Sequence, residues 1–141
     1  MSVIYQRVAL IGLGLIASSM AHAMREAGIA GSVAGHAKSE ATRKAALDIG
    51  FCDEVFATAT DAVKDADLVV LAVPVGAMAA IAAEIGPHLK PGACVSDVGS
   101  VKQAVIEAVA PHVPQGVAFA PAHPLAGPEH SGPHSGFARL S

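Results

Sequence analysis

The chain has 141 residues, of which 52% are hydrophobic and 15% are charged, so it can form a buried core and lies outside the disordered class of proteins. Nine basic and twelve acidic side chains give a formal net charge of −3, which excludes the basic surface of a nucleic-acid-binding or membrane-surface protein. A small-molecule partner is expected instead. Cys52 and Cys94 are far apart, match no CxxC pattern and have apolar neighbours, which predicts buried thiols and a cytoplasmic location.

Short apolar runs alternate with helical patterns along the chain. Apolar runs that end near glycine or proline predict strands at 7–12, 32–36, 54–57, 67–73, 93–98 and 116–122. Apolar residues spaced three or four apart predict helices at 16–27, 40–48, 61–64, 75–89 and 100–110. The first of these helices has its predicted apolar stripe at Ile16, Met20, Ala23, Met24 and Ala27.

This alternation predicts an α/β domain over residues 1–141, built on a doubly wound and mainly parallel sheet. Ligands of such a sheet bind outside the carboxyl ends of the strands. The longest uncharged apolar stretch, 68–83, contains Pro74 and Gly76 and is shorter than the roughly 20 residues of a membrane span. No association with a membrane is therefore expected.

A glycine-rich turn follows the first predicted strand. Gly12, Gly14 and Ala17 form a G-x-G-x-x-A pattern, in which the first glycine permits a tight turn and the second leaves room for a pyrophosphate. The small third residue allows close packing of helix and strand. Because the pattern lies between a strand and an amphipathic helix, it predicts a dinucleotide site at Gly12, Gly14, Leu15, Ile16 and Ala17.

The end of the second strand bears on the choice of cofactor. An acidic residue that binds the 2′-hydroxyl of NAD is expected here, but Ala37 follows the strand and the first acid, Glu40, lies in the first turn of a helix. Nearby cations favour a 2′-phosphate, so NADP is preferred over NAD. The alternative is that these side chains form a solvated helix face and that both cofactors bind. The predicted ligands are His36, Lys38, Ser39 and Arg43.

Two further strand ends contribute to the same predicted crevice. Val73 ends the predicted fourth strand and Pro74 follows it, and Gly99 and Ser100 follow the fifth. Ser100 forms a capping-box pattern with Gln103, so its hydroxyl is expected to cap a helix, and it can contact a substrate as well.

The segment after the sixth strand, AHPLAGPEHSG, contains the strongest candidate for catalysis. His123 is its second residue, and an imidazole suits the removal of a hydroxyl proton during hydride transfer at neutral pH. A zinc site at His123, His130 and His134 was the alternative, but Gly132 and Pro133 interrupt the spacing and no cysteine pair accompanies it. No metal is predicted.

Four segments together resemble the prephenate dehydrogenase family, which includes arogenate and cyclohexadienyl dehydrogenases. They are IGLGLIASSMA at the glycine turn, VPV after the fourth strand, DVGSVK after the fifth and HPLAGPEHSGP after the sixth. The resemblance implies a Rossmann-type domain and an NAD(P)-dependent oxidative decarboxylation in tyrosine biosynthesis. It also implies that His123 is the catalytic histidine, that Ser100 assists it, and that Glu129 belongs to the hydrogen-bond network of the site.

The resemblance further implies a C-terminal helical domain, which this sequence does not contain, and a homodimer of the full-length protein. Prephenate or arogenate is then the substrate, and the 141-residue chain alone is expected to bind dinucleotide without turning the substrate over. The sequence leaves two other functions open. One is a non-catalytic nucleotide-binding or regulatory module, and the other is a hydroxyacid dehydrogenase or imine reductase with the same fold.

Overall fold

A computed structural model describes residues 5–98 and 102–120 as an α/β fold around one parallel sheet. The strands are β1 (Tyr5–Ile11), β2 (Ala30–His36), β3 (Glu54–Phe56), β4 (Leu68–Leu71), β5 (Cys94–Asp97) and β6 (Ala118–Phe119). Their order across the sheet is β3-β2-β1-β4-β5-β6, and all neighbours are parallel. The predicted doubly wound sheet is confirmed, and its strand order reverses between β1 and β4.

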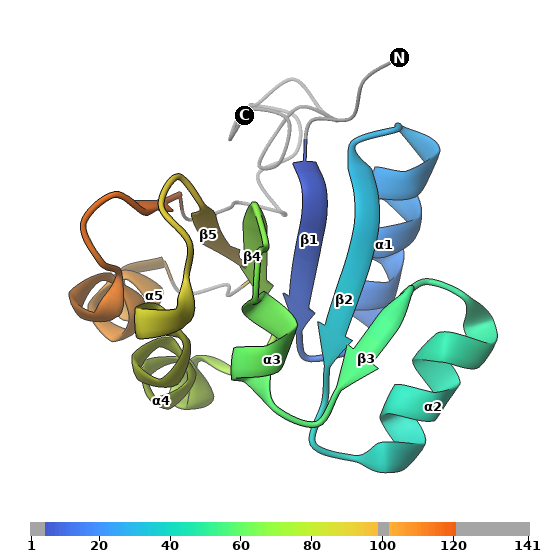
Figure 1. Cartoon of the computed structure of the whole chain (residues 1–141). Coiled ribbons are helices and arrows are strands. Elements are labelled where there is room, and N and C mark those ends of the chain that lie inside the picture. Colours follow the sequence, from blue (N-terminus) through green and yellow to red (C-terminus); the bar gives the residue numbers. More distant parts are fainter. Residues whose placement is uncertain (1–4, 99–101, 121–141) are drawn as a thin grey trace.

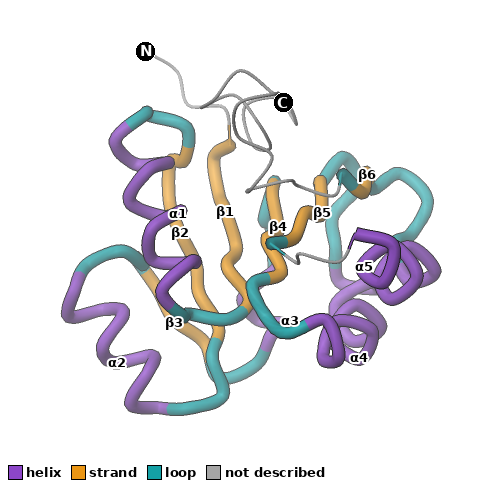
Figure 2. The backbone as a smooth tube through the Cα atoms, turned by 180° about the vertical axis from the view of Figure 1, so that it is seen from behind, coloured by secondary structure: helices purple, strands orange, loops and turns teal. Residues whose placement is uncertain are grey.

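Helices cover both faces of the sheet (Figures 1 and 2). They are α1 (Leu15–Glu26), α2 (Glu40–Ile49), α3 (Ala59–Val63), α4 (Val75–Ile85) and α5 (Lys102–Val109), with 3-10 turns at Gly86–His88 and Ala110–His112. Helices α1 and α2 pack on one face, and α3, α4 and α5 pack on the other. Among the helices of residues 5–98 and 102–120, none is long and apolar enough to cross a membrane.

Alternate residues of the same strand supply the two halves of the core. On β1, Val8 and Leu10 pack on the side of α1 and α2, whereas Ala9 and Ile11 pack on the side of α3, α4 and α5. All four residues of β4 are buried as well. This is why the central strands are continuous apolar runs rather than alternating ones, as expected for a sheet covered on both faces.

The buried face of α1 differs from the predicted stripe. Ala17, Ala21 and Met24 are buried, Met20 is only half-buried, and Ala23 is exposed. The helix is therefore turned so that two alanines meet the sheet. Small side chains allow α1 to lie close to the strands, which periodicity alone does not reveal.

Several elements have other bounds than those predicted. Helix α3 begins at Ala59 because the Thr58 hydroxyl accepts a hydrogen bond from the Asp61 amide at 3.3 Å and caps it. Helix α4 ends at Ile85 and continues only as a 3-10 turn through Pro87, which has no amide hydrogen to extend an α-helix. Strands β4 and β6 are shorter than the apolar runs that contain them.

Both cysteines are free and buried, as predicted from their apolar neighbours. Burial raises the pKa of the Cys52 thiol to about 11 and raises the pKa of Cys94 as well. Both thiols are therefore protonated at neutral pH and act as packing groups.

Charged contacts join the amino ends of the strands. Arg25 donates to the Asp53 carboxylate at 2.6 Å, and the same oxygen accepts from the Val33 amide at 2.7 Å. Asp67 accepts from the Arg7 amide at 3.0 Å and pairs with Lys90. The hydrogen bond from Arg25 is the main reason that the pKa of Asp53 lies below its ordinary value. For Asp67, burial acts to raise the pKa, but the bonds from Lys90 and Arg7 outweigh it and the net shift is downward.

We expect these carboxylates to make the fold acid-sensitive. Their pKa values are lower in the folded chain than in the unfolded chain, so their stabilisation is present above the unfolded pKa and is lost as the pH falls through the folded one. Asp53→Asn should lower the free energy of unfolding by about 1 kcal/mol at pH 7, because the pair is partly solvated, and by much less at pH 3. Urea unfolding at both pH values measures this. Asp48→Asn, an exposed carboxylate on α2, is the control, and equal effects of the two substitutions would contradict the assignment.

Candidate functional site: a dinucleotide crevice

The glycine turn lies at the carboxyl edge of the sheet, where its neighbours hold it in place. The Gly12 amide donates to the His36 carbonyl at the end of β2, at 2.8 Å. On the other side, the Ala72 amide after β4 donates to the Ile11 carbonyl, also at 2.8 Å. The turn is thus tied to both strands that flank β1, at the point where the strand order reverses.

Gly12 and Gly14 serve this turn in different ways. Gly12 has φ +100°, and a Cβ there would overlap the Ala72 carbonyl oxygen and lie 2.9 Å from its carbon. Gly14 has extended backbone, and a Cβ there would meet nothing within 4 Å. Gly12 is therefore required by the protein itself, whereas Gly14 leaves open space beside the first residues of α1.

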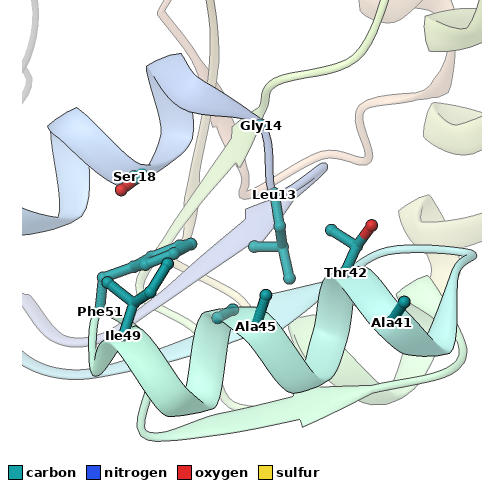
Figure 3. Close-up of a pocket in the computed structure, with 9 residues that line it drawn as sticks. Leu13, Gly14, Ser18, Ala41, Thr42, Ala45, Ile49 and Phe51 are labelled. Carbon is teal, nitrogen blue, oxygen red and sulfur yellow. The ribbon is translucent and has the colours of Figure 1, made fainter.

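That open space is bordered by a hollow between α1 and α2, which Figure 3 shows from the side of α2. Its volume is about 490 Å³, and Leu13 points from the turn toward α2 within it. The Leu13 side chain packs closely against the backbone of Gly35 in β2. A Cβ atom added at Gly35 would lie only 2.8 Å from a Leu13 side-chain carbon and 2.7 Å from the Cys52 sulfur. The lining residues are Leu13, Gly14, Ser18, Ala41, Thr42, Ala45, Ala46, Ile49 and Phe51.

The start of α1 fits a pyrophosphate. No side chain caps this helix at Gly14, so the first amides of α1 have no intrahelical acceptor and carry the positive end of the helix dipole. Ala17 is fully buried between helix and sheet, as its place in the pattern predicts. Leu15 and Ile16 supply backbone at the first turn of α1. An uncapped helix start beside open space is the arrangement that binds phosphate groups in other proteins.

The loop from β2 to α2 brings the predicted cofactor ligands together. His36 Nδ1 lies 3.1 Å from the Phe56 carbonyl of β3, which can only accept, so this nitrogen carries the hydrogen. The Ser39 hydroxyl accepts from the Thr42 amide at 3.3 Å and caps α2, as predicted. Lys38 is exposed beside it. Glu40 is the first residue of α2, as expected from the sequence.

Arg43 makes a contact that the sequence did not predict. Its NH1 nitrogen donates to the Ala37 carbonyl at 2.7 Å and to the Lys38 carbonyl at 3.0 Å. The sequence predicts either a cation for the cofactor or a solvated helix face at this position. Sequence spacing alone could not have shown that its side chain folds back on the loop.

The fourth strand brings two further predicted residues to the crevice. Val73 borders the glycine turn, since a Cβ on Gly12 would lie 3.0 Å from the Val73 Cγ1 atom. Pro74 is the N-cap of α4, and its carbonyl accepts from the Ala77 amide at 2.9 Å. The segment after β4 therefore ends at Pro74, where helix α4 begins.

Asp97 was not singled out from the sequence. It is the last residue of β5 and is completely buried, so it lies at the same edge of the sheet as the glycine turn. An acid near the carboxyl end of a mostly apolar predicted strand is the signal that could have identified it. The Val98 amide next to it donates to the Leu71 carbonyl of β4 at 3.2 Å, which ties this strand end to the crevice.

Several predicted residues are not placed by the structure. The proposed catalytic residues His123, Ser100 and Glu129, and the cofactor ligand Gly99, lie outside the described residues. The same holds for His130 and His134 of the alternative metal site. Their predicted roles stay predictions.

Comparisons with known proteins agree with this geometry. Residues 20–141 match the family described as "Prephenate dehydrogenase, nucleotide-binding domain". A cyclohexadienyl dehydrogenase of Zymomonas mobilis is 42% identical over 137 residues, which are 97% of this chain and 46% of that protein. A prephenate dehydrogenase of Bacillus subtilis is 31% identical over 126 residues, or 89% of this chain and 34% of that protein. The chain thus spans less than half the length of these relatives.

Solved structures give the same result. The prephenate dehydrogenase of A. aeolicus, crystallised with hydroxyphenyl propionate and NAD⁺, superposes with a TM-score of 0.76 at 29% identity. The arogenate dehydrogenase of Synechocystis superposes with a TM-score of 0.75, also at 29% identity. Each match covers 86% of this chain and 42% of the other.

Proposed function

Because the chain belongs to the prephenate dehydrogenase family, we propose that it is the cofactor-binding part of an NAD(P)-dependent enzyme that oxidises and decarboxylates prephenate or arogenate in tyrosine biosynthesis. The observation that carries this proposal is the glycine turn at the reversal of strand order, with open space at Gly14 beside the uncapped start of α1. Membership in this family argues against the alternative that the chain belongs to a hydroxyacid dehydrogenase or an imine reductase.

The residues that would hold the dinucleotide lie together at the carboxyl edge of the sheet. The first amides of α1 would bind the pyrophosphate, Val73 and Pro74 would border the adenosine half, and the β2 to α2 loop would contact its ribose. When bound, the nicotinamide ring supplies the hydride acceptor of the reaction.

His123, Ser100 and Glu129 are proposed to complete the chemistry. Oxidation moves a hydride from the ring carbon to the nicotinamide and a proton from the hydroxyl to a base. Loss of CO₂ then leaves its electron pair in the ring, which becomes aromatic, and the proton returns to the phenolic oxygen. His123 would take the proton or hold the hydroxyl in place, and an imidazole has a suitable ordinary pKa for that step. Ser100 would assist His123, and Glu129 would hydrogen-bond within the site. Homodimerisation of the full-length protein and its cytoplasmic location stay predictions.

We also propose that NADP binds at least as tightly as NAD. The support is that Ala37 stands where an NAD-specific acid is expected, while Lys38 is exposed on the same loop. Titration of the purified chain with each dinucleotide, followed by calorimetry, measures both dissociation constants. A clear preference for NAD that disappears in Glu40→Gln would contradict the proposal, because it would show that Glu40 reaches the ribose.

A further inference from the structure

Arg43 holds the β2 to α2 loop through both its backbone and its side chain. Its amide donates to the Ser39 carbonyl at 3.1 Å, which is the first bond of α2. Its NH1 nitrogen donates to the carbonyls of Ala37 and Lys38 at 2.7 and 3.0 Å. This nitrogen has two hydrogens, so the two carbonyls use both of them. Three consecutive carbonyls of the loop therefore accept hydrogen bonds from this one residue.

These contacts also fix the direction of the neighbouring amides. The described peptide bonds are all trans, and in a planar trans peptide the carbonyl and the following N–H point in opposite directions. Because the carbonyls of Ala37 and Lys38 point toward Arg43, the amides of Lys38 and Ser39 point away from it. Within residues 5–98 and 102–120, neither amide has a hydrogen-bond partner. The Ser39 hydroxyl accepts from Thr42, so its own hydrogen is left to donate.

We propose that Arg43 is a positioning residue for the adenosine ribose of the cofactor, which it serves through the loop rather than by binding the 2′-phosphate. By turning two carbonyls inward, it presents the amides of Lys38 and Ser39 as donors to the ribose, whether that ribose carries a hydroxyl or a phosphate. Lys38, which is exposed, is then the cation that distinguishes the phosphate. This inference rests on the proposed dinucleotide site.

The roles of the two cations can be separated by measuring both dissociation constants in variants. Arg43→Ala should weaken NAD and NADP alike, by about tenfold, because a loop that must be ordered on binding lowers affinity for any ligand of that loop. Lys38→Ala should weaken NADP alone. Lys44→Ala, which removes an exposed cation of the same helix, should change neither constant. A loss confined to NADP in Arg43→Ala would make Arg43 a phosphate ligand, and no loss at all would show that the loop needs no support. Either result overturns the inference.

A second measurement needs no dinucleotide. In the free protein, hydrogen exchange of the amides of Thr42 and residue 43, which donate to the hydroxyl and the carbonyl of Ser39, should be faster in Arg43→Ala than in the wild type or in Lys44→Ala, with core strands unchanged as the internal control. Alanine favours helix, so α2 should persist. Unchanged exchange at these amides overturns the inference whatever the binding results. If exchange rises but the wild type binds neither dinucleotide, the proposed function fails while the hold of Arg43 on the loop stands.

Discussion

Gly12→Ala is expected to destabilise the fold strongly, whereas Gly14→Ala is expected to leave the fold intact and weaken dinucleotide binding. At Gly12 the backbone has φ +100°, and the added methyl group would overlap the Ala72 carbonyl oxygen. Strain and overlap together should cost about 3 kcal/mol or more, a large part of the stability of an ordinary domain. The overlapped atom belongs to the backbone after β4, so no side-chain movement can relieve it.

At Gly14 the same substitution meets only open space. The backbone there is extended, which alanine adopts freely, so the free energy of unfolding should stay within about 0.5 kcal/mol of the wild type. Binding should weaken by at least about tenfold, because the methyl group fills the path proposed for the pyrophosphate. Thermal unfolding and dinucleotide titration of the two variants separate the effects. A Gly14→Ala protein that binds normally would place the phosphates elsewhere, and a fully stable Gly12→Ala protein would contradict the described turn.

His123→Asn is expected to lower turnover by about 10²- to 10⁴-fold, the usual worth of a positioned general base, without changing cofactor affinity. The experiment is done in the full-length enzyme with prephenate and with arogenate, by following reduction of the dinucleotide. Asparagine keeps hydrogen-bonding groups but cannot accept a proton at neutral pH.

His88→Asn is the matched control, since His88 is exposed in the 3-10 turn between α4 and the amino end of β5, away from the carboxyl edge of the sheet where the glycine turn lies. It should turn over substrate at the rate of the wild type. Equal rates for the wild type and His123→Asn would reduce His123 to a loop residue. A loss of cofactor affinity in His123→Asn would instead assign it to the cofactor site.

Much of the fold could be predicted from the sequence because burial on both faces leaves a direct pattern. β4 is apolar at every position, and the run around it was found for that reason. The bounds were less predictable where a single local contact decides them. Thr58 starts α3 through its hydroxyl, and Pro87 limits α4 to Ile85. The rotation of α1 depends on how closely Ala17 and Ala21 approach the sheet, which is a tertiary property.

The sequence predicts which residues belong to the candidate site better than it predicts what each of them does. Gly12 and Gly14 were identified together, but only the surrounding atoms show that one is required by the protein and the other borders open space. Arg43 was expected as a cation, and its bonds to two loop carbonyls depend on the direction of those carbonyls, which no spacing encodes. Asp97 could not be predicted because a single acid beside Ser96, in a short and mostly apolar strand, is a weak signal.

The charged contacts of Asp53 and Asp67 and the glycine turn occupy opposite ends of the strands, and this separation has a consequence for how such a domain can diverge or be engineered. Substitutions at the amino ends can change resistance to heat or acid while the cofactor crevice keeps its shape, because distant sites that share no partners act on stability independently. Homologous enzymes adapted to different temperatures should therefore differ freely at positions such as Arg25 and Lys90. They should share the small residues that shape the turn.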